Sequence, residues 1–336
     1  MLMSGGEAAR VLDRARGRLF GVVGRWPAAQ ALARRRGLRL CVVGCLSVAA
    51  AFAGVALAPL AMLALAPLLL GVPHLASDVR YLLVRRAVIT SRARVPLAAA
   101  ALVCTVAAAL GDLQLMAASG LGGVALAAAL GDGPTARRAA GSALAAALAA
   151  ASWAWPRSAA LAMAHGHNLV AVALALWLVR RALWAAWLPS LAGAAGVAAI
   201  AAGALDGPLG HALAVGSRAA SLTAVAVVPP GAPSVVALRL IGLFAFAQAV
   251  HYAAWLRLVP DGERDAERPI GFRRSLALLR ADFGRATPWL LAACVALPLA
   301  ACVRFASARG AYFTLAAFHG YLELAFVAAL FASRRG

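Results

Sequence analysis

Long apolar stretches of about 20 residues recur along the chain, separated by short polar segments rich in arginine and glycine. A helix needs about 20 apolar residues to cross the hydrocarbon core of a bilayer. A membrane β-barrel would instead show short segments of alternating hydrophobicity. The pattern therefore predicts an all-α, polytopic integral membrane protein. It is expected to be a helical bundle with about ten transmembrane helices, at 39–58, 60–84, 96–112, 113–131, 139–155, 159–179, 182–204, 235–256, 287–304 and 311–331.

The arginines between these stretches predict the orientation. If the N-terminus is inside, most of the arginines outside the first 37 residues fall in segments expected on the inner side, and few fall in outer segments. This asymmetry is the one that the positive-inside rule describes, and it predicts that both termini are cytoplasmic. We expect a bacterial inner (cytoplasmic) membrane. The third and fourth stretches meet at Gly111 and Asp112 with almost no loop, so one broken helix there would change the count and the later orientation.

Two parts are expected. Residues 1–37 form an arginine-rich amphipathic arm, predicted to be cytoplasmic and to lie on anionic lipid, and residues 38–336 form a single transmembrane domain. Within this domain, 205–234 is the longest outer loop, and its middle is expected to form a re-entrant or interfacial helix. The longest inner loop is 257–286, and its amphipathic piece 272–283 is expected to lie along the inner surface.

Composition narrows the class of protein. Hydrophobic residues make up 64% of the chain and the mean hydropathy is +0.85, which excludes an ordinary soluble domain. The formal charge of +20 would suit nucleic acid, but the arginines cluster at helix ends, where they serve membrane topology. We therefore expect the lipid bilayer as a partner and no nucleic acid.

Polar residues inside apolar stretches are the main signal for function. His74 and Asp78 lie four residues apart in one stretch, and His319 and Glu323 repeat this spacing near the C-terminus. Positions four apart share one face of a helix, so each pair can converge on one point. A charged group at mid-membrane costs roughly 2.5–3.5 kcal/mol, so such residues indicate a functional site.

Three further histidines, His165, His167 and His251, lie in other apolar stretches. With the two His/acid pairs they form a candidate intramembrane metal site. His165 and His167 point about 200° apart on a regular helix, so one of them is expected to face the site. At roughly 1.5 Å per residue, His165, His167 and His319 lie about 9–12 Å below the outer surface and His74 and His251 nearer 20 Å, which leaves one site or two open.

A mixed set of imidazoles and carboxylates suits Fe(II) best, while zinc, copper or haem stay alternatives. Asp78 has a competing interpretation, an ion pair with Arg80 or Arg85. Six other residues near the candidate ligands are expected to orient them or to line an apolar substrate site, with interfacial or core packing as the alternative role of the aromatic ones: Asn168, Gln248, Tyr81, Tyr252, Trp255 and Tyr321.

The segment GVPHLASD at 71–78 resembles the opening motif, GxPHGAxDH, of the Brp/Blh family of membrane β-carotene 15,15′-dioxygenases. Gly71, Pro73, His74 and Asp78 match it, whereas Leu75 replaces a glycine and Val79 replaces a second histidine. The resemblance implies a polytopic protein with intramembrane iron held by histidines.

We therefore expect a membrane-embedded, iron-dependent enzyme, an oxygenase or dioxygenase acting on an apolar small molecule such as a carotenoid or another lipid. Two alternatives remain. One is a proton- or ion-coupled transporter that uses relays of histidine and acid. The other is a haem-binding membrane protein with axial histidines.

Overall fold

A computed structural model of the chain describes residues 5–86, 88–180, 185–215, 227–263 and 269–333. Every regular element within these ranges is a helix, and no strand occurs in them. The prediction of an all-α chain is confirmed.

The arm at the start of the chain forms α1 (Gly5–Val23) and α2 (Pro27–Arg34). The bundle that follows comprises α3 (Arg36–Leu57), α4 (Pro59–Asp78), α5 (Ser91–Leu110), α6 (Leu113–Ala129), α7 (Thr135–Ala154), α8 (Pro156–Leu178), α9 (Trp187–Ala201), α10 (Asp206–Val215), α12 (Ser234–Ala253), α13 (Val259–Gly262), α14 (Phe272–Phe283), α15 (Thr287–Val303), α16 (Phe305–Ala316) and α17 (His319–Phe331). Two of these continue as π-helices, α4 into Val79–Val84 and α12 into Ala254–Leu258.

Many helices of the bundle are long and apolar enough to cross a membrane. Among the described residues, seven helices are long and apolar enough to cross a membrane, and the bent pair α9 and α10 would make an eighth. The expected total of about ten spans also included α6 and α7. Of these two, α6 is an apolar helix of only 17 residues. A helical membrane protein is therefore supported, while the total of ten and the side on which each terminus lies stay predictions.

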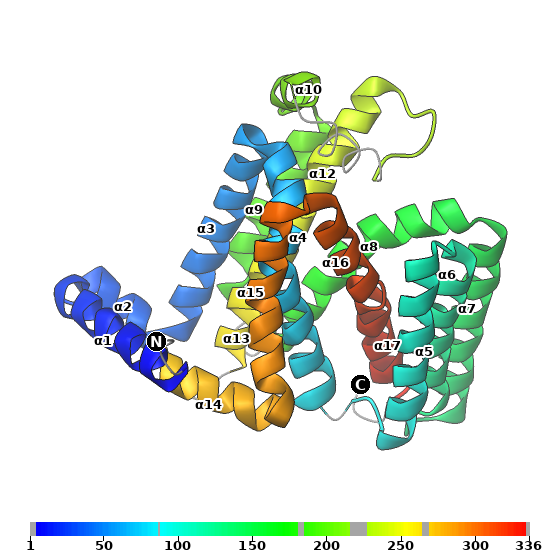
Figure 1. Cartoon of the computed structure of the whole chain (residues 1–336), viewed down its shortest axis with the longest axis horizontal. Coiled ribbons are helices and arrows are strands. Elements are labelled where there is room, and N and C mark those ends of the chain that lie inside the picture. The colour runs from blue at the N-terminus through cyan, green and yellow to red at the C-terminus, as the bar shows by residue number, and fades with distance from the viewer. Residues whose placement is uncertain (1–4, 87, 181–184, 216–226, 264–268, 334–336) are drawn as a thin grey trace.

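The third and fourth expected spans are two separate helices. α5 ends at Gly111, whose φ of 73° suits glycine, and the Asp112 side chain accepts a hydrogen bond from the Leu115 amide at the start of α6. The helices α5, α6 and α7 then lie side by side at one edge of the bundle (Figure 1). One broken helix at this position is excluded.

Amphipathic helices lie at one end of the bundle. The expected surface helix is α14, which runs across the direction of α15 and next to α1 (Figure 1). α10, at the opposite end, occupies only the beginning of 205–234 (Figure 1). The middle of that segment, where a re-entrant or interfacial helix is expected, falls on residues 216–226, which lie outside the described ones. Whether the arm and α14 rest on a lipid surface stays a prediction.

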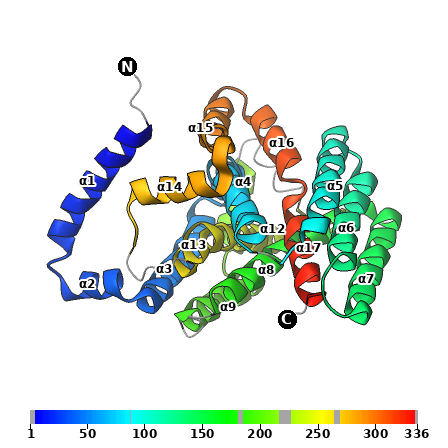
Figure 2. The same cartoon turned by 90° about the horizontal axis from the view of Figure 1, so that it is seen from below.

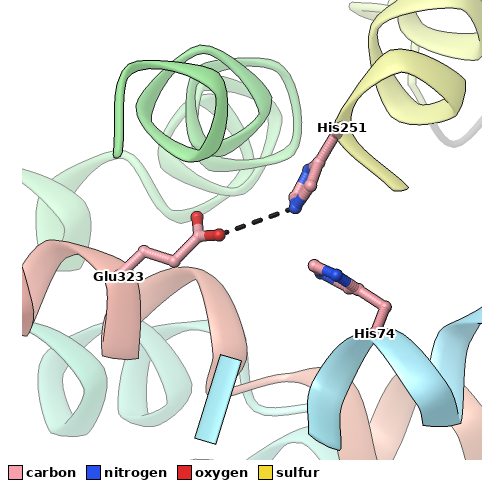
Figure 3. A group of neighbouring side chains, drawn as sticks. All are labelled: His74, His251 and Glu323. Carbon is pink, nitrogen blue, oxygen red and sulfur yellow. Dashed lines mark ion pairs between the residues drawn. The ribbon is translucent and has the colours of Figure 1, made fainter. Parts of the chain in front are cut away.

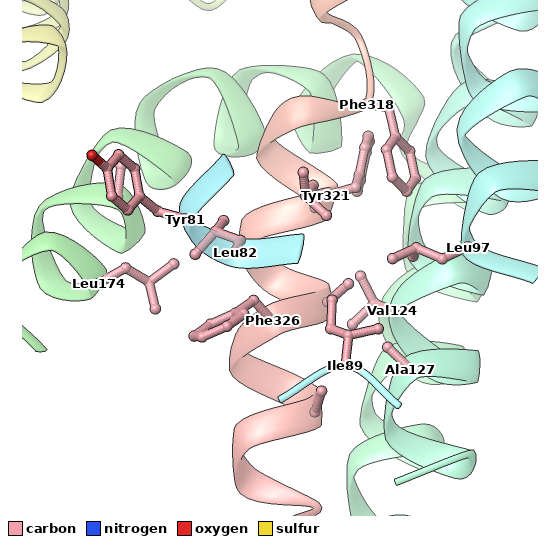
Figure 4. Close-up of a cluster of buried hydrophobic side chains, with 14 of the residues drawn as sticks. Tyr81, Leu82, Ile89, Leu97, Val124, Ala127, Leu174, Phe318, Tyr321 and Phe326 are labelled. Atoms are coloured by element: carbon pink, nitrogen blue, oxygen red, sulfur yellow. The ribbon is translucent and has the colours of Figure 1, made fainter. Parts of the chain in front are cut away.

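The core that positions the site is built around α17. Phe326 and Tyr321 of this helix are buried, and α17 lies between the apolar side chains of Leu82 and Leu174 on one side and those of Leu97 and Val124 on the other (Figure 4). α17 is thus held in the interior, and its polar residues are buried with it.

Candidate metal centre

Four helices carry six polar groups to one place in the bundle. α4 carries His74 and Asp78, α8 carries His167, α12 carries His251, and α17 carries His319 and Glu323. Each lies in the interior of an apolar helix of spanning length, within Pro59–Val84, Pro156–Leu178, Ser234–Gly262 or Phe305–Phe331.

The tightest part of this cluster has two imidazoles and one carboxylate. One ligand atom each of His74, His251 and Glu323 can be chosen so that all three lie within 4.8 Å of one another. The three side chains point toward one another from three different helices, and His251 Nε2 lies 3.5 Å from Glu323 Oε1 (Figure 3). All three residues are fully buried, so bulk water does not reach the point at which they meet.

The other two histidines close the cluster. The ring centroid of His167 lies 5.0 Å from that of His319 and 5.3 Å from that of His251. His74 lies 5.5 Å from His319 and 4.4 Å from His251. The four rings therefore form one group rather than two separated by depth.

The possibility of two sites at different depths does not match this single group of rings. The span formed by α16 and α17, which carries His319, begins at Phe305 rather than at 311, and α8, which carries His167, begins at Pro156 rather than at 159. Both histidines consequently lie further from the start of their spans than the predicted boundaries imply.

Backbone carbonyl groups fix the orientation of two rings. His167 Nδ1 lies 2.9 Å from the carbonyl oxygen of Met163, and His319 Nδ1 lies 2.5 Å from that of Ala316. A carbonyl oxygen only accepts, so each Nδ1 carries the proton and each Nε2 keeps its lone pair. Histidines that bind metals commonly have their second nitrogen held in this way.

Asn168 orients His251. Its amide nitrogen donates to the Ala164 carbonyl oxygen at 3.0 Å, so the Oδ1 atom is the one that faces His251 Nδ1, at 2.8 Å. His251 Nδ1–H therefore donates, and Nε2 is left facing Glu323. The expectation that Asn168 orients a ligand agrees with this contact, whereas Gln248 instead donates to the Tyr252 hydroxyl at 3.5 Å.

Several buried polar atoms of the cluster have no hydrogen-bond partner among the described residues. They are both ring nitrogens of His74, Nε2 of His251, and the carboxylate oxygens of Asp78 and Glu323. Asp78 Oδ2 does approach His74 Nε2, at 3.2 Å. Burying such groups without partners is costly, and buried polar groups in proteins are nearly always satisfied. A cation at the point where His74, His251 and Glu323 meet would provide a partner for one ring nitrogen of His74, for His251 Nε2 and for the Glu323 carboxylate.

The competing interpretation of Asp78 does not match the contacts. Arg80 and Arg85 both pair with Asp282 of α14, with nitrogen–oxygen distances of 2.5 Å and 3.0 Å. Tyr81, expected near the ligands, instead packs against these two guanidinium groups. Asp78 therefore forms no ion pair with Arg80 or Arg85, and its carboxylate lies beside His74 in the cluster.

Two other histidines lie elsewhere. His165 Nε2 lies 2.9 Å from the Val227 carbonyl oxygen, and its ring packs edge-on against Phe244. This agrees with the expectation that one residue of the His165/His167 pair faces the site, and His167 is the one that does. His211 is exposed on α10.

Aromatic side chains pack around the cluster. The ring of Tyr252 lies 5.0 Å from that of His74, and the ring of Trp255 lies 6.3 Å from it. The hydroxyl of Tyr252 is hydrogen-bonded to that of Tyr312 at 3.1 Å. Sequence reasoning missed Tyr312 because no spacing relates it to the histidines.

Two cavities reach the cluster from the side of His167. One, of about 480 Å³, is lined by His167, His319 and Tyr252 among mostly apolar residues. The other, of about 410 Å³, is lined by His167 and Tyr321. The expected place of Tyr252 and Tyr321 beside an apolar site agrees with these linings.

Sequence reasoning also missed the two π-helices. Val79–Val84 directly follows Asp78, and Ala254–Leu258 begins three residues after His251. π-Helical turns are often found at functional sites. Ser77 Oγ donates to the Trp255 carbonyl oxygen at 2.8 Å, so the two helices are joined beside the cluster.

No protein-family model, curated protein or solved structure matches the chain. The likeness of 71–78 to the Brp/Blh motif stays a prediction.

Proposed function

We propose that this protein is a membrane-embedded, non-haem iron oxygenase that acts on an apolar substrate such as a carotenoid or another lipid. The observation that carries the proposal is the convergence of His74, His251 and Glu323 at one buried point. Two histidines and one carboxylate with further positions open are the ligand set typical of non-haem Fe(II) oxygenases.

His167 and His319 are the candidates for further ligands, since their Nδ1 atoms are held by carbonyl oxygens and their rings adjoin the three. Asp78 is a ligand candidate as well, and its Oδ2 atom lies 3.2 Å from His74 Nε2. Six candidate groups are enough for one iron with open positions or for two metal ions. The mixture of imidazole with carboxylate favours iron over copper, and zinc fits the same donors.

Bound to these side chains, Fe(II) would supply the activation of dioxygen that an oxygenase needs. The protein's own part is to hold the ligands and exclude water. The Asn168 side chain orients the His251 ring through a hydrogen bond. The Trp255 side chain, which has no exposed surface, packs beside His74. A dry site prevents side reactions of a reactive centre.

The cavity of about 480 Å³ is the candidate substrate site. Its volume falls within the usual range of ligand pockets, and most of its lining is apolar, with a few polar groups at the cluster. Tyr252 and Tyr312 line it with their hydroxyl groups hydrogen-bonded to each other, which favours an apolar occupant at that wall.

Metal analysis of purified protein tests the proposal. We expect one or two non-haem iron atoms per chain, lost in His74→Ala, His319→Ala and Glu323→Gln. His165→Ala and His211→Ala are matched controls and should keep the wild-type metal content, because their rings lie outside the cluster. Dioxygen uptake by the iron-loaded protein should then depend on an added carotenoid or similar apolar compound.

Other outcomes would contradict this function. A Soret band with stoichiometric haem would indicate the haem-binding alternative. Protein that takes up no metal at all, with unchanged fold in His74→Ala, would favour a transporter with a His/acid relay. Equal metal content in the cluster variants and in His165→Ala would refute the assignment of ligands.

A further inference from the structure

A further cavity, not lined by any histidine, lies at the end of the bundle that carries the arm. It has a volume of about 470 Å³ and is lined by residues of α1, α3, α14 and the π-helical ends of α4 and α12. The helices α1, α3 and α14 come together at that end of the bundle (Figures 1 and 2). Five guanidinium groups and one carboxylate line it: Arg16, Arg39, Arg80, Arg85, Arg257 and Asp261.

Three of these arginines are paired with carboxylates. Arg39 forms a two-pronged contact with Asp261, at 2.6 Å and 2.9 Å. Arg80 and Arg85 share Asp282, which comes from α14. Three guanidinium groups thus share two carboxylates, so positive charge is in excess where these arginines line the cavity.

The remaining two arginines add positive charge. Arg16 donates to the backbone carbonyl oxygens of Ile270 and Pro269, which carry no formal charge. Arg257 is exposed and has no ion-pair partner among the residues that the structure describes. Among the described residues, the guanidinium groups outnumber the carboxylates even when nearby Asp13 is counted beside Arg16.

The walls between the arginines are apolar. Phe20 of α1, Val43 of α3, Leu278 of α14 and Leu256 of the π-helix after α12 line the same cavity. Leu19 and Phe20 of α1 are also exposed. A ligand that fits must therefore combine negative charge with tolerance of an apolar wall.

We propose that this cavity binds a phosphate group. Guanidinium groups present planar forks of N–H donors that match phosphate oxygens, which makes arginine clusters typical phosphate sites. Two sources share this chemistry, the headgroup of an anionic phospholipid and a soluble phosphate ester. The apolar walls and the position at the end of a membrane bundle favour the lipid headgroup.

Arg257→Gln is the main test variant, because this arginine forms no ion pair that its loss would break within the described structure. Arg92→Gln is the matched control, an exposed arginine at the start of α5 that does not line the cavity. Both variants are first compared with wild type by size-exclusion chromatography and thermal unfolding. Arg16→Gln is the second test variant.

The lipid arm of the experiment uses nanodiscs of phosphatidylglycerol and phosphatidylcholine, with retained lipids counted by native mass spectrometry. We expect wild type and Arg92→Gln to retain phosphatidylglycerol selectively, and Arg257→Gln and Arg16→Gln to bind it about tenfold more weakly, as for loss of one charge-assisted contact. This result would support a lipid-headgroup site.

The soluble arm uses detergent-solubilised protein titrated calorimetrically with inorganic phosphate and with glycerol 3-phosphate. Saturable binding that Arg257→Gln weakens about tenfold, without selective lipid retention, would support the phosphate site and identify a soluble ligand. Wild-type binding of all three probes by Arg257→Gln and Arg16→Gln would overturn the site, and so would an equal loss in Arg92→Gln. Metal content is not a readout in either arm, so the result is independent of the proposed oxygenase.

Discussion

Asn168→Leu is the sharpest test of how the cluster is held. The substitution keeps the approximate size of the side chain but removes the oxygen that accepts from His251 Nδ1–H at 2.8 Å. Both residues are buried, so water does not replace the lost partner. An unsatisfied buried donor costs about 1–3 kcal/mol. The imidazole escapes this cost by moving its proton to Nε2, the atom that faces Glu323.

That shift of the proton would block a metal ligand. Loss of a group that orients a ligating histidine typically lowers metal affinity about 10–100-fold. This corresponds to about 1.4–2.8 kcal/mol at 1.4 kcal/mol per tenfold, which agrees with the cost of the unsatisfied donor. We therefore expect Asn168→Leu to bind Fe(II) about 10–100-fold more weakly in a competition titration against a chelator of known affinity.

Two companion variants make the result specific. Asn168→Asp keeps an acceptor oxygen and should restore most of the affinity. Gln248→Leu alters a buried side chain one turn from His251 that is bonded to Tyr252 instead, so it should change metal affinity little. If Asn168→Leu retains wild-type affinity, or if Gln248→Leu lowers it equally, the role assigned to Asn168 is wrong.

Two further predictions concern packing and the arm. In Gly71→Ala the added Cβ would collide with the Tyr312 ring, so we expect destabilisation by about 1–3 kcal/mol in thermal unfolding. Gly166→Ala meets nothing within 4 Å and should be neutral or stabilising. Asp13→Ala removes the carboxylate that accepts from the first two amides of α14, so limited proteolysis should cleave α1 faster than in wild type. Because these hydrogen bonds hold the Asp13 pKa below its usual 3.8, the contact is complete above that pH and is lost as pH falls through the lowered pKa.

Much of the architecture follows from the sequence because apolar helices in a bilayer must satisfy their own hydrogen bonds. Each expected span contains a helix among the described residues, although 311–331 covers the end of α16 and all of α17. The amphipathic piece 272–283 coincides with α14. The ligand candidates follow from the same argument, since His74, Asp78, His319 and Glu323 are polar residues in apolar stretches. In the sequence only Asp78 has arginines close by, Arg80 and Arg85.

The arrangement of the site could not be predicted in the same way. Spacing shows which residues share a face of one helix, but not which faces of four helices meet. In the sequence, Gln248 and Asn168 are equivalent as orienting groups, and only the packing of α8 against α12 puts the Asn168 oxygen on His251. Tyr81 is expected near the ligands, yet it lies in the π-helical segment with its ring against the guanidinium groups of Arg80 and Arg85.

The π-helices connect the two proposed sites. Each one follows a histidine-bearing helix and ends at the arginine-lined cavity, which Tyr81 and Arg85 line from one side and Leu256 and Arg257 from the other. A π-turn changes the direction in which all later side chains point relative to the earlier ones. In both helices the π-helical turn thus separates two directions. The histidine before the turn points toward the cluster, and the arginine after it lies at the cavity at the end of the bundle. Ser77, which bonds to the Trp255 carbonyl group, holds the two helices together at that change.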